Sequence, residues 1–342
     1  MEPLPTLTAD ELARLERALL DGIVVETSGS TEKPKRVMLS ADAIRASAAA
    51  TASVIGVGGW VLALPLSYIA GIMVVARALI AGQPLVDFRA EPFGAERFVD
   101  SVKELPEGTW FTSFVPTQLA RLVDLAEVDS DAVTALTRFD AILVGGQAIP
   151  AGLVERAAAL GVRVIKTYGS AETAGGVVYD GIPIGDTELR IAEDGVLEIR
   201  SSSLASGYRG DEERTARDFA NGWFRTSDIA HIDNGRLVID GRVDDIIVTG
   251  GVKVSLADIE RVLQEAGISA VATWFADDEW GQVPALVSTD VLDLDTSRRV
   301  IETALGKAAR PYRAVTVAEI PTLSSGKVDR IAIREIVQAE QP

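Results

Sequence analysis

The chain has 342 residues, with 33 Lys and Arg, 50 Asp and Glu, a single His and no Cys. These counts exclude disulfides and thiolate metal sites. With His231 as the one imidazole, they also exclude multi-histidine metal centres and argue against a Ser-His-Asp triad. The formal net charge of −17 argues against non-specific nucleic-acid binding, which needs basic surface, although a site for a small anion needs only a few local donors.

The N-terminal part of the chain predicts a helix, two short strands and a second helix. The residue pattern favours an amphipathic helix over residues 7–20, capped by Thr8, and shows no secretory leader, so we expect a cytoplasmic protein. Strands are predicted at residues 23–25 and 36–39, and an Ala-rich helix over residues 41–54.

The loop between these two strands is a candidate phosphate site. It carries four hydroxyl groups, a glycine and a lysine, at Thr27, Ser28, Gly29, Ser30, Thr31 and Lys35. Backbone N–H groups, hydroxyls and one cation are what a polyphosphate needs. The loop does not match the Walker A pattern, and on composition alone a plain polar hairpin is an equal alternative.

A long uncharged stretch follows. Residues 54–76 contain no charged side chain and are numerous enough to span a bilayer. Pro65, nearby glycines and Arg77 favour instead a buried strand over residues 60–66 and a buried helix through residue 80. We therefore expect no membrane span.

A strand–helix–strand unit is predicted next, with strands at residues 139–144 and 162–167. Such units form parallel sheets, and ligands bind beyond the carboxyl ends of the strands. Tyr168 there could stack on a base. Glu172 could hold Mg²⁺ against phosphate oxygens, or could simply be an acid favoured by a helix dipole.

Turn signals over residues 181–239 predict a β-rich subdomain. Within it, the Asp228 carboxylate could accept two hydrogen bonds from a ribose diol, although Asp is also common in turns. His231 is expected in a turn, in a structural role. A polar join at residues 241–245 precedes the C-terminal elements, which are a helix to residue 266, strands around residues 277–281, a helix over 296–308, a strand through 320 and a last helix.

The predicted fold is therefore α/β. We expect a large N-terminal domain over residues 1–240, with a parallel α/β sheet and the β-rich subdomain, and a small α+β domain over residues 246–342, connected by residues 241–245, whose polar composition indicates a mobile join.

Six motifs in chain order resemble those of the adenylate-forming superfamily of acyl-CoA synthetases, adenylation domains and luciferases. They are residues 27–35, 145–147, 168–173, 222–228, 241–245 and 321–330. Within the superfamily the chain is most similar to the o-succinylbenzoate–CoA ligases of menaquinone synthesis, of the short actinobacterial kind, on residues 64–71, Arg77 and residues 175–181.

The resemblance implies an AMP-forming ligase that uses ATP, Mg²⁺ and CoA to convert an aromatic dicarboxylate through an acyl-adenylate. It implies that Lys327 stabilises the adenylation transition state, that Glu172 holds Mg²⁺ and that the loop at residues 27–35 holds the phosphates. The implied adenine and ribose residues are Gly145, Gly146, Gln147, Tyr168, Gly169, Asp228 and Arg242.

The resemblance also implies an acyl pocket, a hinge at Asp244 and a CoA tunnel at Gly250, Gly251 and Lys253. The pocket residues would be Ser67, Tyr68, Gly71, Arg77, Thr112, Ser113, Ser170 and Gly175, with Thr112 and Ser113 in a loop. Arg77 would bind the second carboxylate, with a helix-surface arginine as an equal alternative.

The chain departs from the superfamily pattern at several positions. Glu32 and Arg36 replace glycines, Ala171 replaces a threonine, and only 26 residues precede Thr27, so we expect a shortened N-terminal subdomain. The alternatives are another aryl or fatty acid–CoA ligase or adenylating enzyme, and a non-catalytic nucleotide-binding relative. The oligomeric state stays open, with a homodimer among the arrangements considered.

Overall fold

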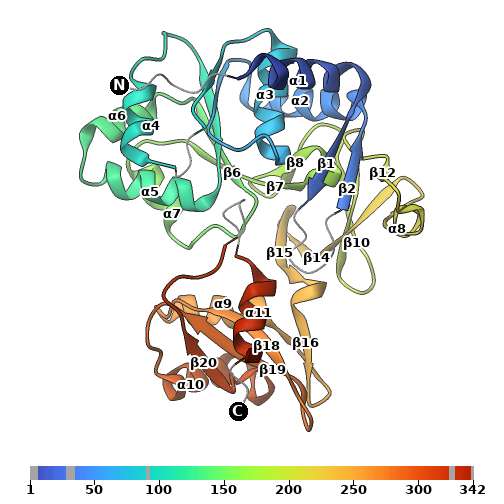
Figure 1. Ribbon diagram of the computed structural model, residues 1–342, viewed down its shortest axis with the longest axis vertical. Coiled ribbons are helices and arrows are strands. Elements are labelled where there is room, and N and C mark those ends of the chain that lie inside the picture. The colour runs from blue at the N-terminus through green and yellow to red at the C-terminus, as the bar shows by residue number, and fades with distance from the viewer. Residues whose placement is uncertain (1–6, 28–34, 90–92, 323–327, 340–342) are drawn as a thin grey trace.

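The computed structural model describes residues 7–27, 35–89, 93–322 and 328–339. Figure 1 shows two bodies, with the elements up to β14 and β15 above and the elements from β16 onward below. β15 (Arg236–Arg242) ends four residues before β16 (Ile246–Thr249) begins, and the domain boundaries at residues 240 and 246 stay a prediction.

The N-terminal elements form as predicted. Helix α1 (Ala9–Asp21) is capped by Thr8, whose Oγ1 accepts a hydrogen bond from the Glu11 backbone N–H. Strands β1 (Ile23–Thr27) and β2 (Lys35–Leu39) pair antiparallel and β12 (Gly207–Tyr208) extends the sheet. Thr27 lies opposite Lys35, so the described part of the hairpin ends where the predicted phosphate loop begins.

The central sheet has seven strands in the order β4-β3-β5-β6-β7-β8-β9. The five strands β3 to β7 are parallel, and β8 and β9 are antiparallel to their neighbours. The strands are β3 (Gly59–Leu62), β4 (Leu85–Asp87), β5 (Trp110–Phe114), β6 (Ala141–Gly145), β7 (Val164–Ser170), β8 (Gly175–Tyr179) and β9 (Ile182–Pro183). The parallel pairing of β6 and β7 confirms the predicted strand–helix–strand unit.

Helices cover both faces of this sheet, so β3, β5 and β6 are buried along nearly all of their length. Successive residues alternate between the two cores: Phe111 faces the core formed with α1, α2 and α3, and Trp110 faces the core formed with α4 to α7. The helices are α2 (Ala41–Ile55), α3 (Ile69–Ala81), α4 (Ala95–Val102), α5 (Pro116–Ala126), α6 (Ser130–Thr137) and α7 (Leu153–Ala159).

The uncharged stretch forms a buried strand and helix, as expected. In the part of the chain that the structure describes, no helix is long and apolar enough to cross a membrane. The expected strand over residues 60–66 is too long, because β3 ends at Leu62 and the chain turns at Pro65, which has no N–H for a sheet ladder. A Cβ on Gly71 would lie 2.3 Å from the Pro65 carbonyl oxygen, so glycine lets α3 pack closely on this turn.

The β-rich part is a five-stranded sheet in which β14 pairs with β11, β13 and β15. Its tight turns at Asn221 and Asn234, both with positive φ and each followed by a glycine, are those that the sequence predicts. The elements are β10 (Glu188–Ile191), β11 (Val196–Arg200), α8 (Glu212–Asp218), β13 (Phe219–Ala220), β14 (Trp223–Asp233) and β15. The expected turn at His231 is wrong, because this residue lies within β14, where its Nδ1 is 2.8 Å from Asp240 Oδ2; its structural role stays a prediction.

The lower body is a second five-stranded sheet in which β20 pairs parallel to β19. Its elements are β16, β17 (Val252–Ser255), α9 (Leu256–Glu265), β18 (Val271–Asp277), β19 (Gly281–Ser288), α10 (Leu294–Leu305), β20 (Arg313–Thr316) and α11 (Arg330–Ala339). The expected helix over residues 296–308 ends early at Leu305, because Gly306 adopts a positive φ and terminates it. The expected strand through residue 320 ends at Thr316.

Arg89 connects the first helix to the central sheet. Its Nη1 lies 2.6 Å from Glu11 Oε1 in α1, and its Nη2 lies 2.6 Å from Oδ2 of the buried Asp87 at the end of β4. The hydrogen bonds from Arg89 and from the Thr8 backbone lower the pKa of Glu11 from 4.5 to about 2.

We expect Arg89→Met to lower the free energy of unfolding by roughly 2–3 kcal/mol at pH 7, because it leaves the buried Asp87 without its guanidinium partner. The folded-state pKa of Glu11 is depressed, so its contribution is complete above pH 4.5 and is lost as the pH falls towards 2. Urea unfolding at pH 7 and pH 3 should show a smaller difference from the wild type at pH 3. An equal loss in the exposed control Arg261→Met would contradict the assignment.

Candidate functional site

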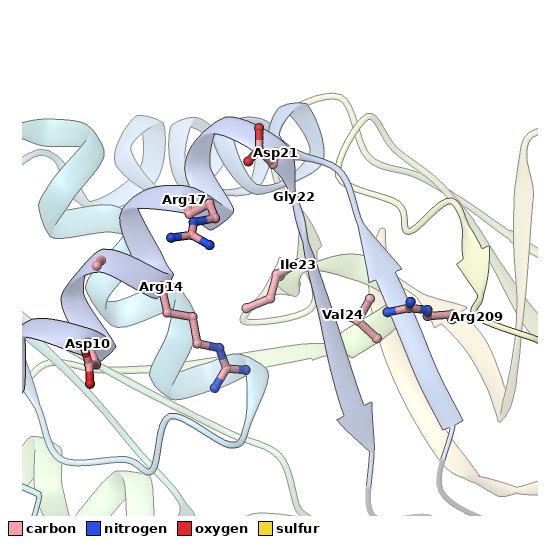
Figure 2. A pocket seen from close by; sticks show the side chains of 9 residues that line it. Asp10, Arg14, Arg17, Asp21, Gly22, Ile23, Val24 and Arg209 are labelled. Atoms are coloured by element: carbon pink, nitrogen blue, oxygen red, sulfur yellow. The ribbon is translucent and has the colours of Figure 1, made fainter.

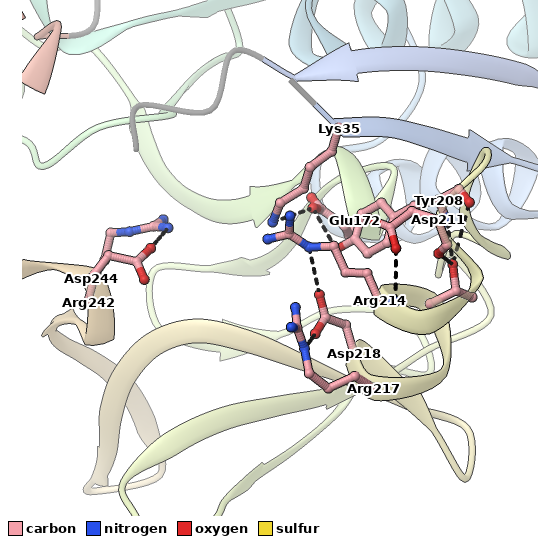
Figure 3. Close-up of polar contacts among 10 residues, drawn as sticks. Lys35, Glu172, Tyr208, Asp211, Arg214, Arg217, Asp218, Arg242 and Asp244 are labelled. Atoms are coloured by element: carbon pink, nitrogen blue, oxygen red, sulfur yellow. Dashed lines mark hydrogen bonds and ion pairs between the residues drawn. The ribbon is translucent and has the colours of Figure 1, made fainter. Parts of the chain in front are cut away.

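The Glu172 carboxylate lies at the end of β7, in the short helical turn η1 (Ala171–Thr173). Thr173 holds this turn, because its Oγ1 accepts from the Ser170 backbone N–H at 2.9 Å and donates to the Gly175 carbonyl at 2.7 Å. Glu172 is 6% exposed, and Figure 3 shows its carboxylate beside the Lys35 ammonium group and the Tyr208 hydroxyl. The strand predicted over residues 162–167 instead spans residues 164–170 as β7, so Tyr168 and Gly169 still belong to it.

Two groups hold one oxygen of this carboxylate. The Tyr208 hydroxyl donates a 3.1 Å hydrogen bond to Glu172 Oε1, and Lys35 Nζ lies 3.8 Å from the same oxygen. Burial, followed by the charge of Glu172, raises the pKa of Tyr208 far above its ordinary value, so the phenol remains a donor at neutral pH.

The donor set fits a magnesium ion that is shared with a ligand. Both contacts use Oε1, so Oε2 of Glu172 has no partner among the described residues. In that part of the chain no three His, Cys, Asp or Glu side chains come together as a metal site. Mg²⁺ is commonly bound by one or two carboxylates together with substrate phosphates, which matches a single available carboxylate oxygen.

A second cluster brings together three residues predicted for adenine and ribose. The Tyr168 hydroxyl donates to Asp228 Oδ2 at 2.5 Å, and Arg242 Nη1 lies 3.5 Å from Oδ1 of the same residue. Asp228 and Arg242 are cross-strand partners in β14 and β15. Burial, and then the charge of Asp228, raises the pKa of Tyr168 well above its ordinary value. Arg242 also contacts Asp244, the predicted hinge residue, at 3.1 Å.

Arg77 is buried in α3, and none of the ion pairs among the described residues includes it. Its guanidinium carbon lies 5.2 Å from the centre of the Trp60 ring, and its Nε has no hydrogen-bond partner among the described residues. At 7% exposure it is not a surface arginine, so that alternative is wrong. Desolvation by burial lowers its pKa. A buried guanidinium without a counter-ion is costly, which indicates a place for an anion.

Gly175 and Ser170 lie beside this guanidinium. A Cβ on Gly175 would lie 3.9 Å from Arg77 Nη2, and Gly175 pairs with Ser170 between β8 and β7. The Ser170 hydroxyl is also buried without a partner in the described structure. Gly175 therefore links the other two predicted pocket residues, and each of those two carries a buried polar atom without a partner among the described residues.

The other predicted pocket residues divide into two groups. Tyr68 occupies the N-cap position of α3 without a side-chain capping hydrogen bond, and Ser67 lies exposed in the turn before it. Thr112 and Ser113 lie inside β5 rather than in a loop, and all five residues of this strand are buried in the sheet. The Thr112 hydroxyl donates to the Val61 carbonyl at 2.9 Å, so it is engaged in the sheet.

The predicted adenine-side glycines allow neighbouring strands to approach closely. A Cβ on Gly145 would lie 2.4 Å from Thr167 Oγ1, and one on Gly169 would lie 2.0 Å from the Gly175 carbonyl oxygen. Gly146, with φ of 85°, turns the chain out of β6 towards Gln147. These glycines are explained by packing and turn geometry, whatever ligand they also contact.

Some predicted residues lie outside the described part of the chain, and others lie on the elements that follow the predicted hinge. Ser28, Gly29, Ser30 and Thr31 of the phosphate loop, and Lys327, lie outside the described residues. Gly250 and Gly251, with φ of 55° and 83°, form the turn between β16 and β17, and Lys253 lies on β17. Figure 1 shows β16 extending away from the upper body.

A hollow of about 500 Å³ lies elsewhere, beside α1 and β1. Figure 2 shows Arg14 and Arg17 on α1, and Arg209 beyond the β1–β2 pair. These arginines are exposed, and the hollow contains none of the predicted site residues. It is therefore not the candidate site.

Sequence reasoning missed Tyr208. It is 36 positions from Glu172, and the two meet only because β12 pairs with β2. No short spacing of residues in the sequence predicts this contact.

Comparison with known proteins places the chain among characterised sequences and structures. Residues 24–208 match the family model described as AMP-binding enzyme. A probable 2-succinylbenzoate–CoA ligase of Mycobacterium tuberculosis H37Rv is 37% identical over 324 residues, which cover 91% of this chain and 83% of that protein.

Two solved structures of o-succinylbenzoate CoA synthetase from Bacillus subtilis are also similar. One holds the acyl-adenylate OSB-AMP and has a TM-score of 0.78 at 26% identity, covering 91% of this chain and 68% of that one. The other holds ATP and a magnesium ion and has a TM-score of 0.77 at 25% identity, covering 90% of this chain and 68% of that one.

Proposed function

The chain belongs to the AMP-binding enzyme family, and on that premise we propose that it is an ATP-dependent 2-succinylbenzoate–CoA ligase. The reaction would convert 2-succinylbenzoate, ATP and CoA to 2-succinylbenzoyl-CoA, AMP and diphosphate through an acyl-adenylate. The observation that carries the substrate class is the buried guanidinium of Arg77, which has no counter-ion among the residues that the structure describes and lies next to Gly175. One carboxylate of a dicarboxylate would bind there, and the other would react.

In the first half-reaction, a carboxylate oxygen of the acid attacks the α-phosphorus of ATP and diphosphate leaves. The nucleophile is already an anion, so no general base is needed, which fits a chain with one His and no Cys. The obstacle is electrostatic, because two anions must meet while charge grows on the phosphate oxygens. Lys35, the loop hydroxyls and Lys327 would offset that charge. Mg²⁺, held by Glu172 and the phosphates, would supply further positive charge.

The second cluster would bind the nucleoside. Asp228 would accept hydrogen bonds from the ribose diol, and the Tyr168 hydroxyl, already bonded to Oδ2, would fix the orientation of that carboxylate. Arg242 lies on the other oxygen and would balance its charge. The ring of Tyr168 would lie against adenine.

In the second half-reaction, the CoA thiol attacks the acyl carbon and AMP leaves. We infer that residues 246–342 rotate about Asp244 between the two halves, which withdraws Lys327 and brings the hairpin of Gly250, Gly251 and Lys253 to the pantetheine tunnel. Three apolar side chains on and beside this hairpin are exposed, namely Val248, Val252 and Trp280. Their exposure supports a second arrangement of the two bodies in which this surface is covered. Because ATP and CoA are cytoplasmic metabolites, the proposal also places the chain in the cytoplasm.

A coupled assay of CoA-ester and AMP release tests the proposal, with 2-succinylbenzoate, benzoate and fatty acids offered in turn. We expect kcat/KM for 2-succinylbenzoate to exceed that for benzoate by about 100-fold or more, because only the dicarboxylate pairs with Arg77. Equal values for the two acids would contradict the substrate assignment. The absence of a thioester product from every acid would contradict the ligase assignment.

A further inference from the structure

Tyr208 lies between three elements of the phosphate end of the site. Its strand, β12, pairs with β2, where it lies opposite Val37, and its backbone N–H donates to Thr215 Oγ1 at 2.9 Å. Its ring packs edge-on against Phe219 at 5.5 Å and is 3% exposed. The ring is therefore fixed in place independently of any ligand.

The polar contacts of Tyr208 converge on the groups assigned to phosphate and metal. Its hydroxyl donates to Glu172 Oε1, and Lys35 Nζ lies 5.4 Å from the centre of its ring. The guanidinium of Arg214 lies 5.5 Å from the same ring, and Arg214 Nε donates to Asp218 Oδ2 at 3.4 Å. Figure 3 shows these side chains as one connected group.

In this arrangement the two oxygens of the Glu172 carboxylate have different surroundings. Oε1 is held by the phenol and lies near the ammonium group, whereas Oε2 has no hydrogen bond from any residue that the structure describes. A carboxylate that is fixed by an outer hydrogen bond binds a cation better than one that must be ordered first. The aromatic face also gives the Lys35 ammonium group a second favourable contact, so it need not turn fully to Glu172.

We propose that Tyr208 is a positioning residue for the metal and phosphate end of the site: its hydroxyl fixes the Glu172 carboxylate for Mg²⁺, and its ring holds the Lys35 ammonium group near the phosphates. The proposal rests on the proposed function, because only that function assigns Mg²⁺ to Glu172.

The test is calorimetric titration of ATP into the full chain, with Mg²⁺ or with EDTA and without any acid, so that no reaction occurs. In the wild type, Mg²⁺ should strengthen ATP binding. In Tyr208→Phe, which keeps the ring, this Mg²⁺-dependent gain should fall by about 10-fold or more, while ATP affinity in EDTA stays unchanged. Tyr208→Leu removes the ring as well, so it should lose the Mg²⁺ gain and also weaken ATP binding in EDTA.

Two controls separate positioning from general stability. Tyr179→Phe removes another buried phenol hydrogen bond, the 2.9 Å contact with Thr51, and should leave the Mg²⁺ dependence of ATP binding unchanged. In a Glu172→Gln background, Tyr208→Phe should cause no further loss of Mg²⁺ dependence, because the carboxylate that it positions is gone.

The outcomes are distinguishable. If the wild type gains ATP affinity with Mg²⁺ and both Tyr208 variants keep that gain, the role of Tyr208 is wrong and the proposed function stands. If the wild type binds no ATP in either condition, the proposed function and the role of Tyr208 both fail. A full additional loss from Tyr208→Phe in the Glu172→Gln background also overturns the positioning role.

Discussion

Replacing Lys327 with alanine is expected to slow formation of the acyl-adenylate by about 1000-fold or more. In the proposed first half-reaction, negative charge grows on the α-phosphate as the carboxylate attacks, and a single cation placed on such a transition state accounts for this magnitude. Thioester formation from synthetic acyl-adenylate and CoA should stay within about 10-fold of the wild type, because Lys327 is withdrawn in that half. Diphosphate exchange and single-turnover thioester formation measure the two halves separately.

Lys307→Ala is the matched control, because Lys307 is an exposed lysine of the same C-terminal body. It should leave both half-reactions within about twofold of the wild type. A Lys327→Ala variant that makes adenylate within about threefold of the wild-type rate would contradict the mechanism. Equal losses in both halves would contradict the withdrawal of Lys327.

We expect Arg77→Met to raise KM for 2-succinylbenzoate and also to raise the free energy of unfolding of the ligand-free protein. A pair between a buried guanidinium and a carboxylate is worth roughly 2–5 kcal/mol on truncation, so KM for 2-succinylbenzoate should rise by about 100-fold, with little change for benzoate. In the free protein the same guanidinium is buried with an unsatisfied Nε. Its replacement by an apolar side chain of similar length should therefore raise the free energy of unfolding by about 1 kcal/mol or more.

Steady-state kinetics with both acids and urea unfolding without ligand measure these opposite effects. Arg97→Met, at an exposed position of α4, should change neither quantity appreciably. If Arg77→Met lowers stability and affects both acids equally, Arg77 is a structural residue and the assignment of the second carboxylate is wrong.

The fold was predictable in the segments whose secondary structure is determined by the local sequence. Apolar runs bounded by turn residues identified the buried strands, and the segment from β6 to β7 was predicted as a parallel unit because its two strands flank one short helix. Some errors concern whole segments, since Thr112 and Ser113 were expected in a loop and lie inside β5, and others concern the ends of strands. β3 stops four residues early at Leu62, and β7 continues to Ser170, because tertiary pairing with β8 rather than local propensity decides where it stops.

The candidate site was predictable only where a motif keeps its residues near one strand end. Asp228 and Arg242 are 14 positions apart but meet as cross-strand partners, and both were predicted. Tyr208 was not, because its contact with Glu172 depends on the long-range pairing of β12 with β2. The burial of Arg77 could not be read from the sequence either, since one arginine in an apolar helix can lie on either face.

The most direct test of the proposed mechanism traces a carboxylate oxygen of the acid into the released AMP. If a carboxylate oxygen of the acid attacks the α-phosphorus and the thiol then attacks the acyl carbon, that oxygen leaves with AMP. With 2-succinylbenzoate labelled with ¹⁸O in both carboxylates, mass spectrometry should find one ¹⁸O in each AMP released with the CoA ester. Release of ADP, or of AMP without the label, would contradict the acyl-adenylate mechanism on which every assigned role depends.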